Sequence, residues 1–296
     1  MLRHMGLKVR MAIAGSILFL FYAAIGAVAF AMYGQSVLPI VLVGSVLFVG
    51  FQYKFGKWAA LRSVGAEDMP EEGEYRRIHQ RVEELSRAMG IDKPRLMVAE
   101  MGVPNAFAVG RKGAGTVVIS EEIMRILDDE ELDGVLAHEL AHIRNRDVVV
   151  MVLGQSIASM VGILVQFAVI FSGRRGIGQF ILGMIAGQIA QMLVMVFVLA
   201  ISRYREYVAD ADAAEYTNNP EAMARALEKI SEGAERAKQS RGARTPRGER
   251  QQEQSPLDAG DQVGALMINH ESRGLLQTIF ATHPPIQKRI QALRGA

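Results

Sequence analysis

The chain has 296 residues, half of them hydrophobic, and its mean hydropathy is positive. It contains no cysteine, which excludes structural disulfides and thiolate zinc ligands, so any metal must be held by nitrogen and oxygen atoms. The formal net charge is only +2, and this balance indicates no nucleic-acid partner.

The apolar residues are concentrated in four uncharged blocks, at residues 11–33, 37–53, 148–171 and 177–201. A helix needs about 20 apolar residues to cross the hydrocarbon core of a bilayer. Three blocks reach that length and the second approaches it. The pattern therefore predicts an integral membrane protein whose four transmembrane helices form two hairpins in the lipid bilayer.

Basic residues flank the four blocks at one end of the predicted hairpins: Arg3, Lys8, Arg10, Lys54, Lys57, Arg62, Arg144, Arg146, Arg203 and Arg205. By the positive-inside rule, these ends lie in the cytoplasm. Arg174 and Arg175, in the loop between the last two blocks, oppose this orientation but are outnumbered. We expect a multi-pass protein of the cell (inner or plasma) membrane, with its polar motifs at the cytoplasmic face.

The segment between the two hairpins combines a helical and a strand-like pattern. Residues 67–89 carry apolar side chains at helical spacing among charges and stop at Gly90, which predicts an amphipathic helix. Three strand-like runs follow, at residues 95–99, 105–109 and 116–120, and they predict a small sheet or hairpin.

Residues 138–142 read HELAH, which is an HExxH motif. On a helix, residues four apart share a face, so the imidazoles of His138 and His142 can bind one cation. Glu139 is then close enough to act as the general base that accepts a proton from a water molecule. The motif indicates metal-dependent peptide hydrolysis.

The residues around the motif support its placement on a helix. Asp128 and Glu131 have the spacing of a capping box at a helix start. Arg144 and Arg146 follow the motif, and such charges are typical of a membrane surface rather than of a bilayer interior.

A catalytic zinc takes three protein ligands, and the third should lie on a second helix downstream. Glu206 follows the fourth apolar block, and an even number of membrane crossings returns it to the face that carries the HExxH motif. We assign Glu206 as the ligand. Asp210, one helical turn further on, would accept the free N–H of a ligating histidine. The alternative for Glu206 is a solvated helix residue paired with Arg203 or Arg205.

The last part of the chain contains two helical patterns around a polar stretch. Asn218, Asn219 and Pro220 open a predicted helix, and a short amphipathic helix is predicted over residues 286–293. Residues 234–261 have almost no large apolar side chain, which predicts a mobile linker; a regulatory insert or a substrate-gating flap is an alternative.

These patterns divide the chain into four parts. Residues 1–56 and 148–201 are the two transmembrane hairpins, and residues 57–147 and 202–296 are the two parts of one protease domain. The predicted fold class is a mainly α integral membrane protein with a cytoplasmic α+β domain that contains a small β-sheet.

The combined motifs resemble the HtpX-type membrane zinc proteases, which are relatives of the CAAX prenyl proteases. The resemblance rests on residues 138–142, on residues 202–211 (SRYREYVADA), and on residues 104–110 (PNAFAVG) and 282–285 (THPP). It implies a zincin-like protease domain with one Zn²⁺ per chain.

The family arrangement maps onto His138, His142 and Glu206 as metal ligands, Glu139 as general base and Asp210 as the supporting carboxylate. The resemblance also implies polypeptide substrates, and among them damaged or misfolded membrane proteins, as in protein quality control and the stress response. The natural substrates, the regulation and the oligomeric state stay open.

Two further assignments concern the substrate. Asn105, Ala106 and Phe107 resemble the edge strand with which zinc proteases hold an extended peptide; the alternative is an ordinary sheet strand. His283 would contact the oxyanion of the transition state or the substrate backbone; the alternative is a residue that only precedes a helix.

Two other functions are alternatives to this one. An intramembrane protease of the site-two type would bury its HExxH helix in the bilayer, which the charges on both sides of this motif oppose. A non-enzymatic membrane scaffold would have a structural metal or none, but a structural site needs a fourth protein ligand, and no cysteine or further histidine supplies one.

Overall fold

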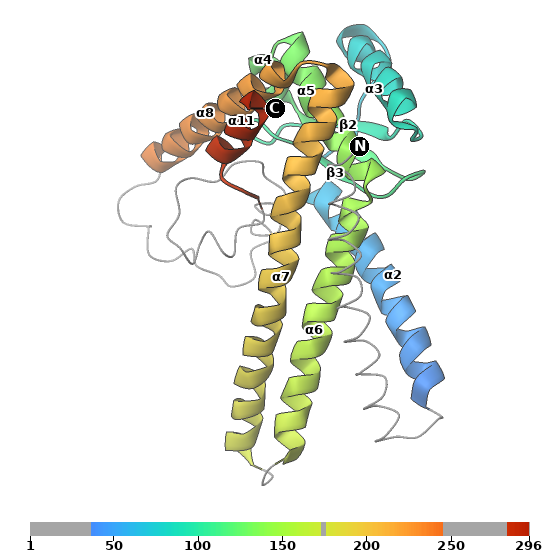
Figure 1. The fold of residues 1–296 in the computed structure, drawn as a ribbon, viewed down its shortest axis with the longest axis vertical. Coiled ribbons are helices and arrows are strands. Elements are labelled where there is room, and N and C mark those ends of the chain that lie inside the picture. Colours follow the sequence, from blue (N-terminus) through green and yellow to red (C-terminus); the bar gives the residue numbers. More distant parts are fainter. Residues whose placement is uncertain (1–36, 173–175, 245–282, 296) are drawn as a thin grey trace. The chain divides into compact units, whose positions relative to one another are not determined.

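The computed structural model describes residues 37–172, 176–244 and 283–295. The first predicted transmembrane block, residues 11–33, lies outside the described residues. The chain divides into two compact units (Figure 1). The described residues of the first lie within residues 1–54 and 151–198, and those of the second lie within residues 55–150 and 199–296.

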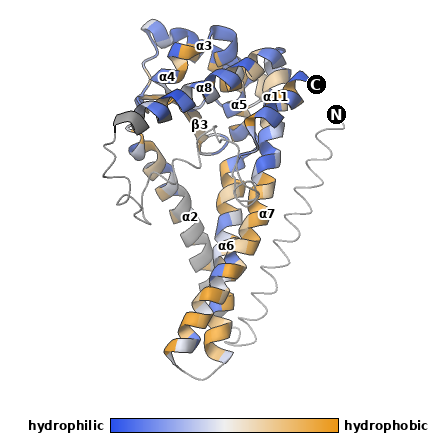
Figure 2. Cartoon of the chain, turned by 90° about the vertical axis from the view of Figure 1, so that its left-hand side faces the viewer, coloured by the Kyte–Doolittle hydropathy of each residue, from blue (hydrophilic) through white to orange (hydrophobic). Residues whose placement is uncertain are grey.

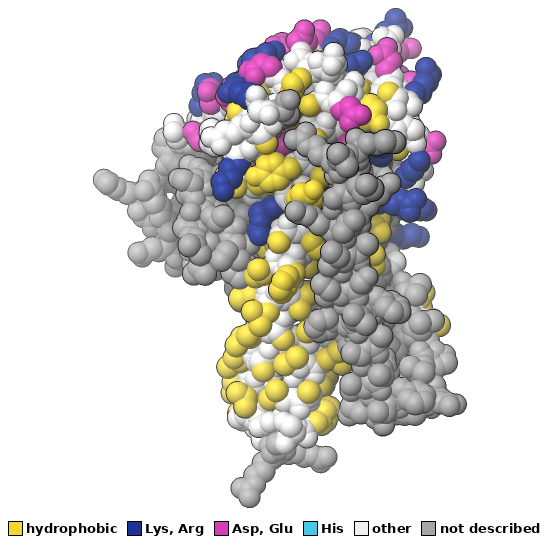
Figure 3. Space-filling view, in the orientation of Figure 1, with side chains coloured by type: hydrophobic (Ala, Val, Ile, Leu, Met, Phe, Trp, Pro, Cys, Tyr) yellow, Lys and Arg dark blue, Asp and Glu magenta, His cyan; other side chains and the backbone are white. Residues whose placement is uncertain are grey.

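The first unit contains the apolar helices. They are α2 (Val37–Ser63), α6 (Asp147–Ser172) and α7 (Ile177–Thr217). One end of each of these helices belongs to the second unit. Among the described helices, α6 and α7 are long and apolar enough to cross a membrane by length and composition. Figure 2 shows hydrophobic residues along both helices, and Figure 3 shows hydrophobic side chains on the surface of this part of the molecule. The exposed side chains of these helices include Phe171, Leu193 and Phe197.

Glycines allow α6 and α7 to pack closely. A Cβ atom added at Gly187 would lie 2.6 Å from the carbonyl oxygen of Gly162, and one at Gly183 would lie 2.8 Å from the carbonyl oxygen of Gln166. Because these distances leave no room for a methyl group, the two backbones approach each other as small residues permit in membrane helices.

The second unit is built around a four-stranded sheet. The strands are β1 (Glu67–Asp68), β2 (Arg95–Ala99), β3 (Ala106–Val109) and β4 (Thr116–Ser120), in the order β1-β2-β4-β3. β2 and β4 are parallel, whereas β1 and β3 pair antiparallel with their neighbours. β3 therefore lies at an edge of the sheet.

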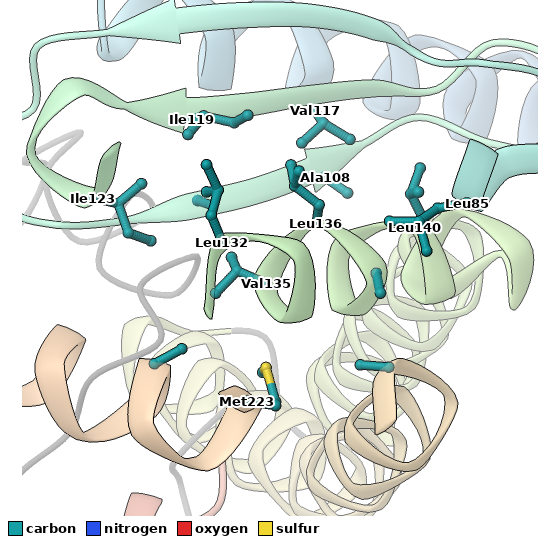
Figure 4. Close-up of a cluster of buried hydrophobic side chains, with 14 of the residues drawn as sticks. Leu85, Ala108, Val117, Ile119, Ile123, Leu132, Val135, Leu136, Leu140 and Met223 are labelled. Carbon is teal, nitrogen blue, oxygen red and sulfur yellow. The ribbon is translucent and has the colours of Figure 1, made fainter. Parts of the chain in front are cut away.

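Both faces of the sheet are covered because successive strand residues point to opposite sides. One face packs on α3 (Arg76–Met89) and α5 (Asp129–Arg144), and Figure 4 shows Ala108 and Val117 above Leu136 in this core. The other face presents Phe107 and Val118 to the end of α2.

The helices around α5 complete the second unit. They are η1 (Gly73–Tyr75), α4 (Glu121–Ile126), α8 (Pro220–Arg244) and α11 (Ile286–Arg294). Met223 of α8 packs so closely on α5 that a Cβ atom at Gly134 would lie 3.2 Å from the Met223 backbone (Figure 4). The sheet, α5 and α8 thus form three layers, with the HExxH helix in the middle.

The start of α5 agrees with its prediction, whereas the start of α3 does not. The capping box is present, since Asp128 Oδ1 accepts from the Glu131 N–H at 2.9 Å and Glu131 Oε2 accepts from the Asp128 N–H at 3.0 Å. The amphipathic helix begins at Arg76 rather than at residue 67, because residues 67–68 pair with β2 and Gly73 takes a positive φ of 68°.

The predicted linker is also wrong at its start. α8 continues to Arg244, so residues 234–244 are helical; they contain no proline and are rich in good helix formers, and Arg236 pairs with Glu232 one turn earlier. Residues 245–261 lie outside the described residues. The count of four membrane spans stays a prediction.

Candidate metal centre

The two histidines of the HExxH motif lie one turn apart on α5 and face the same point. Their rings are nearly perpendicular, with centroids 4.6 Å apart, and the two Nε2 atoms are 3.1 Å apart. His138 is buried, and His142 is partly exposed. The Nδ1 atom of each ring points away from that point.

Glu206, near the end of α7, joins this pair. Its Oε1 atom lies 3.5 Å from His142 Nε2 and its Oε2 atom lies 3.7 Å from His138 Nε2. The three residues each offer a ligand atom within 4.8 Å of the others. Glu206 is buried and does not pair with the neighbouring Arg205, so the structure does not show the solvated alternative.

Asp210 lies behind His138, with its Oδ1 atom 3.0 Å from His138 Nδ1. The same carboxylate receives two hydrogen bonds from Arg289 of α11, at 2.8 Å from Nε and 2.6 Å from Nη2. The contact with His138 is at hydrogen-bonding distance but without the alignment of a full hydrogen bond. His138, Asp210 and Arg289 form a buried series that we call the His138 support.

A second series stands behind His142. Its Nδ1 atom donates to Asp147 Oδ2 at 2.6 Å, and the other oxygen of Asp147 lies 2.6 Å from Nη2 of Arg205. Asp147 and Arg205 are both about 5% exposed. His142, Asp147 and Arg205 form the His142 support.

Sequence reasoning did not find Asp147, Arg205 or Arg289. Asp147 stands in a basic run five residues after His142, which is a usable signal. The pattern of basic residues around the apolar blocks assigns Arg205 to a membrane-flanking position. For Arg289 there was no signal, since nothing local distinguishes it from the other basic residues of α11.

Glu139 lies on α5 between the two histidines and is only 3% exposed. Burial raises its pKa above the ordinary glutamate value, against the neighbouring histidines and a hydrogen bond from the backbone of Ala108, which lower it. Ala108 belongs to β3, so the carboxylate of Glu139 lies beside the edge strand. A raised pKa suits a carboxylate that must both accept and release a proton.

The two residues assigned to substrate contacts differ in position. His283 joins the centre, with its Nδ1 atom 3.1 Å from Glu206 Oε1. Asn105 is buried just before β3; its backbone exchanges hydrogen bonds with Ser120, while its Oδ1 atom has no hydrogen-bond partner among the described residues. Ala106 and Phe107 are paired with β4 through their backbones.

The residues present fit a divalent cation such as zinc. Tetrahedral ligands at about 2.0–2.1 Å from an ion lie about 3.4 Å from one another, and the separations here are 3.1, 3.5 and 3.7 Å. Oε2 of Glu206 is buried without a hydrogen bond from the described residues. With neutral histidines, the buried carboxylates Glu139, Asp147, Glu206 and Asp210 exceed the buried arginines Arg205 and Arg289 by two charges.

A helix-borne HExxH pair completed by a buried glutamate, beside the edge strand of a small mixed sheet, defines a metallopeptidase site. The profile of peptidase family M48 matches residues 72–296. The chain belongs to peptidase family M48.

Relatives and a solved structure agree with this family. A "Protease HtpX homolog" from Halobacterium salinarum is 60% identical over 96% of this chain and 100% of its own length. Homologues of the same description from Pyrococcus abyssi and Aquifex aeolicus are 36% and 35% identical, over 80% and 86% of this chain and 77% and 82% of theirs. The predicted HtpX-type resemblance is therefore confirmed, and the chain is a membrane-associated metalloprotease.

The crystal structure of Ste24p from S. mikatae matches 97% of this chain with a TM-score of 0.56 at 16% identity. This chain spans 64% of the length of that protein. The likeness shows that the two share a fold.

Proposed function

We propose that this chain is a zinc-dependent endopeptidase with one Zn²⁺ per chain, held by His138, His142 and Glu206. The convergence of these three side chains within 4.8 Å, with Glu139 between the histidines, carries the proposal. When bound, the ion supplies Lewis-acid chemistry, because it polarises the scissile carbonyl and lowers the pKa of a water molecule.

Glu139 acts as general base and then as general acid. It takes a proton from the attacking water and passes it to the amine that leaves when the peptide bond breaks. Its burial and its raised pKa support this role. His283 contacts the developing oxyanion, and the distance of 3.1 Å between its Nδ1 atom and Glu206 Oε1 supports this role.

The edge strand β3 holds the substrate as an extended chain. Only one side of β3 pairs within the described sheet, where β4 is its neighbour, and β3 contacts the HExxH helix α5. Main-chain pairing selects for unfolded polypeptide more than for particular side chains. This supports substrates that are damaged or misfolded membrane proteins, in a quality-control role.

The topology in the membrane is part of the same proposal. Four spans, a cytoplasmic active site and the cell membrane as location rest on the apolar blocks and on the basic residues that flank them. The HExxH helix α5 is not one of the two described helices that could cross a membrane, which favours this arrangement over an intramembrane protease.

Replacing Glu139 by glutamine tests the mechanism. The Glu139→Gln variant, purified in detergent, should keep about one zinc per chain and lose cleavage of an unfolded protein such as casein by 10²-fold or more, since typical acid–base contributions are about 10²–10⁴-fold. Glu84→Gln is the matched control, because Glu84 is an exposed residue of α3 that pairs with Arg81. Its activity should be unchanged.

Metal removal tests the cofactor. A chelator should abolish cleavage by the wild-type protein, and added zinc should restore it. Wild-type protein with neither metal nor cleavage would favour the membrane scaffold, and cleavage that persists in Glu139→Gln would refute the assigned base.

A further inference from the structure

Arg289 is a buried charged side chain on a helix whose other buried residues are apolar. It lies on α11, the last described helix, and is 0% exposed. Ile286, Ile290 and Leu293 of the same helix belong to the main hydrophobic core and already attach α11 to the second unit. Since moving a guanidinium out of water costs several kcal/mol, its burial requires compensating contacts.

Those contacts are with three residues of the candidate metal centre, Asp210, Glu206 and His138, whose Nε2 atom lies 3.4 Å from Nη2 of Arg289. Nε and Nη2 of Arg289 form a two-pronged pair with the carboxylate of Asp210, at 2.8 and 2.6 Å. Nη1 lies 3.0 Å from Oε2 of Glu206. A planar guanidinium can hold two carboxylates in fixed orientations at once, which an ammonium group cannot do.

The orientation of Asp210 decides what His138 can do. Oδ1 of Asp210 lies 3.0 Å from His138 Nδ1, and the same oxygen accepts the 2.6 Å hydrogen bond from Arg289. A carboxylate behind the ring holds the proton on Nδ1 and leaves Nε2 free to bind a metal. Among the described residues, this carboxylate has polar contacts with Arg289 and His138. Removing Arg289 would leave the contact with His138 alone to orient it.

We propose that Arg289 is a positioning residue of the metal centre, which acts on His138 through Asp210. The inference rests on the proposed function, because it concerns the same zinc site. It makes the C-terminal helix part of that site, although α11 contributes no metal ligand. Zinc binding and the docking of α11 then strengthen each other, since a coupling free energy is reciprocal.

Zinc affinity measures this role directly. The purified full chain in detergent would be titrated with zinc in competition with a chromophoric chelator, for the wild type and for Arg289→Met. We expect a 10- to 100-fold loss of affinity, the usual effect of losing a residue that orients a metal ligand.

Arg294→Met is the matched control on the same helix. Arg294 is exposed and pairs with Glu221 and Glu228, away from the metal centre. It should change zinc affinity by less than twofold. An equal loss in both variants would show that any damage to α11 weakens the site, and would overturn the specific role of Arg289.

The pathway through Asp210 is tested by combining variants. If Arg289 acts through Asp210, then Asp210→Asn and the double variant Arg289→Met/Asp210→Asn should bind zinc with the same affinity. Losses that multiply in the double variant would refute this pathway. Arg289→Lys, which keeps the charge but not the fork, should bind more weakly than the wild type even if Arg289→Met does not fold.

Zinc binding by the wild-type protein separates the role of Arg289 from the existence of the zinc site. A wild-type protein that binds no zinc would refute the proposed function. A wild-type protein that binds zinc and cleaves, together with unchanged affinity in Arg289→Met or Arg289→Lys, would refute the inference alone.

Discussion

The two histidines of the metal centre are supported in the same chemical way but from different parts of the chain. Behind each ring stands an aspartate, and behind each aspartate an arginine. The aspartate of the His142 support is five residues from its histidine. In the His138 support, the aspartate lies on α7, and the arginine lies on α11, 151 residues from the histidine.

The difference comes from how the chain reaches each aspartate. Arg146 takes a left-handed conformation, with φ of 58°, and this turn between α5 and α6 places Asp147 beside His142. Asp210 and Arg289 reach His138 only after α7 and α11 have packed on the second unit. The aspartate of the His142 support is therefore local, whereas the aspartate of the His138 support depends on the tertiary fold, and both arginines come from distant helices. We therefore expect the two histidines to respond differently to mutation.

The largest expected effect is that of Asp147→Ala on stability. Arg205 would lose its described hydrogen-bond partner while still buried, and breaking one side of a buried ion pair costs about 3–5 kcal/mol in the free energy of unfolding. Denaturant unfolding of the detergent-solubilised protein measures this loss. The double variant Asp147→Ala/Arg205→Met should recover most of it, and a double variant as unstable as the single one would contradict the pairing.

Asp210→Asn should affect zinc binding more than folding. Arg289 would keep its contact with Oε2 of Glu206 at 3.0 Å, so the loss of stability should be smaller than for Asp147→Ala. Zinc affinity should fall 10- to 100-fold, or about 1.4–2.8 kcal/mol, by chelator competition. As a control, Asp133→Asn on α5, the helix that carries His138, alters a pair with Arg81 and should leave zinc affinity unchanged. If Asp210→Asn bound zinc as tightly as Asp133→Asn, the proposed effect of Asp210 on His138 would be contradicted.

The two histidines should also differ in how they contribute to the pH dependence of the stability of the metal-free protein. Burial lowers the pKa of His138, but the nearby carboxylates of Asp210 and Glu206 outweigh burial and raise this pKa to about 9. Burial and the charge of His138 lower the pKa of His142 to about 4. The unfolded value for both is about 6.5.

The two shifts predict opposite slopes. The stability due to His138 is fully present below pH 6.5 and is lost as pH rises through about 9, because the folded state binds this proton more tightly. His142 destabilises the fold as pH falls from 6.5 towards 4, because the unfolded state binds its proton more tightly. Melting temperatures of chelator-treated protein between pH 5 and 9 should therefore peak near pH 6.5; a monotonic dependence would contradict the two assignments.

Much of the centre could be predicted from local patterns. The capping box and the HExxH spacing together predict a helix with two imidazoles on one face, and α5 has both features. Glu206 and Asp210 are four apart on α7, so they share a face for the same reason. Their arrival beside α5 followed from the hairpin of α6 and α7, whose two apolar blocks are visible in the sequence.

Other features could not be predicted, because they depend on which surfaces become buried. The start of α3 depended on the pairing of residues 67–68 with β2, a contact between segments about 30 residues apart. Arg289 stands among basic residues of a short amphipathic helix, where a solvated position would be the usual expectation. Only its neighbours in space distinguish it from Arg294.

The proposed chemistry of this protein can be recognised in its amino-acid sequence: helical spacing encodes the proposed metal ligands and base, and runs of apolar residues encode the candidate membrane helices. Helical periodicity and hydropathy act over a few turns, so they can be recognised without the fold. The tertiary structure decided how the charges of the centre are balanced, since Asp147 with Arg205 and Asp210 with Arg289 pair across separate elements. A buried charge needs a partner wherever the chain can bring one, and only the packed chain shows which partner that is.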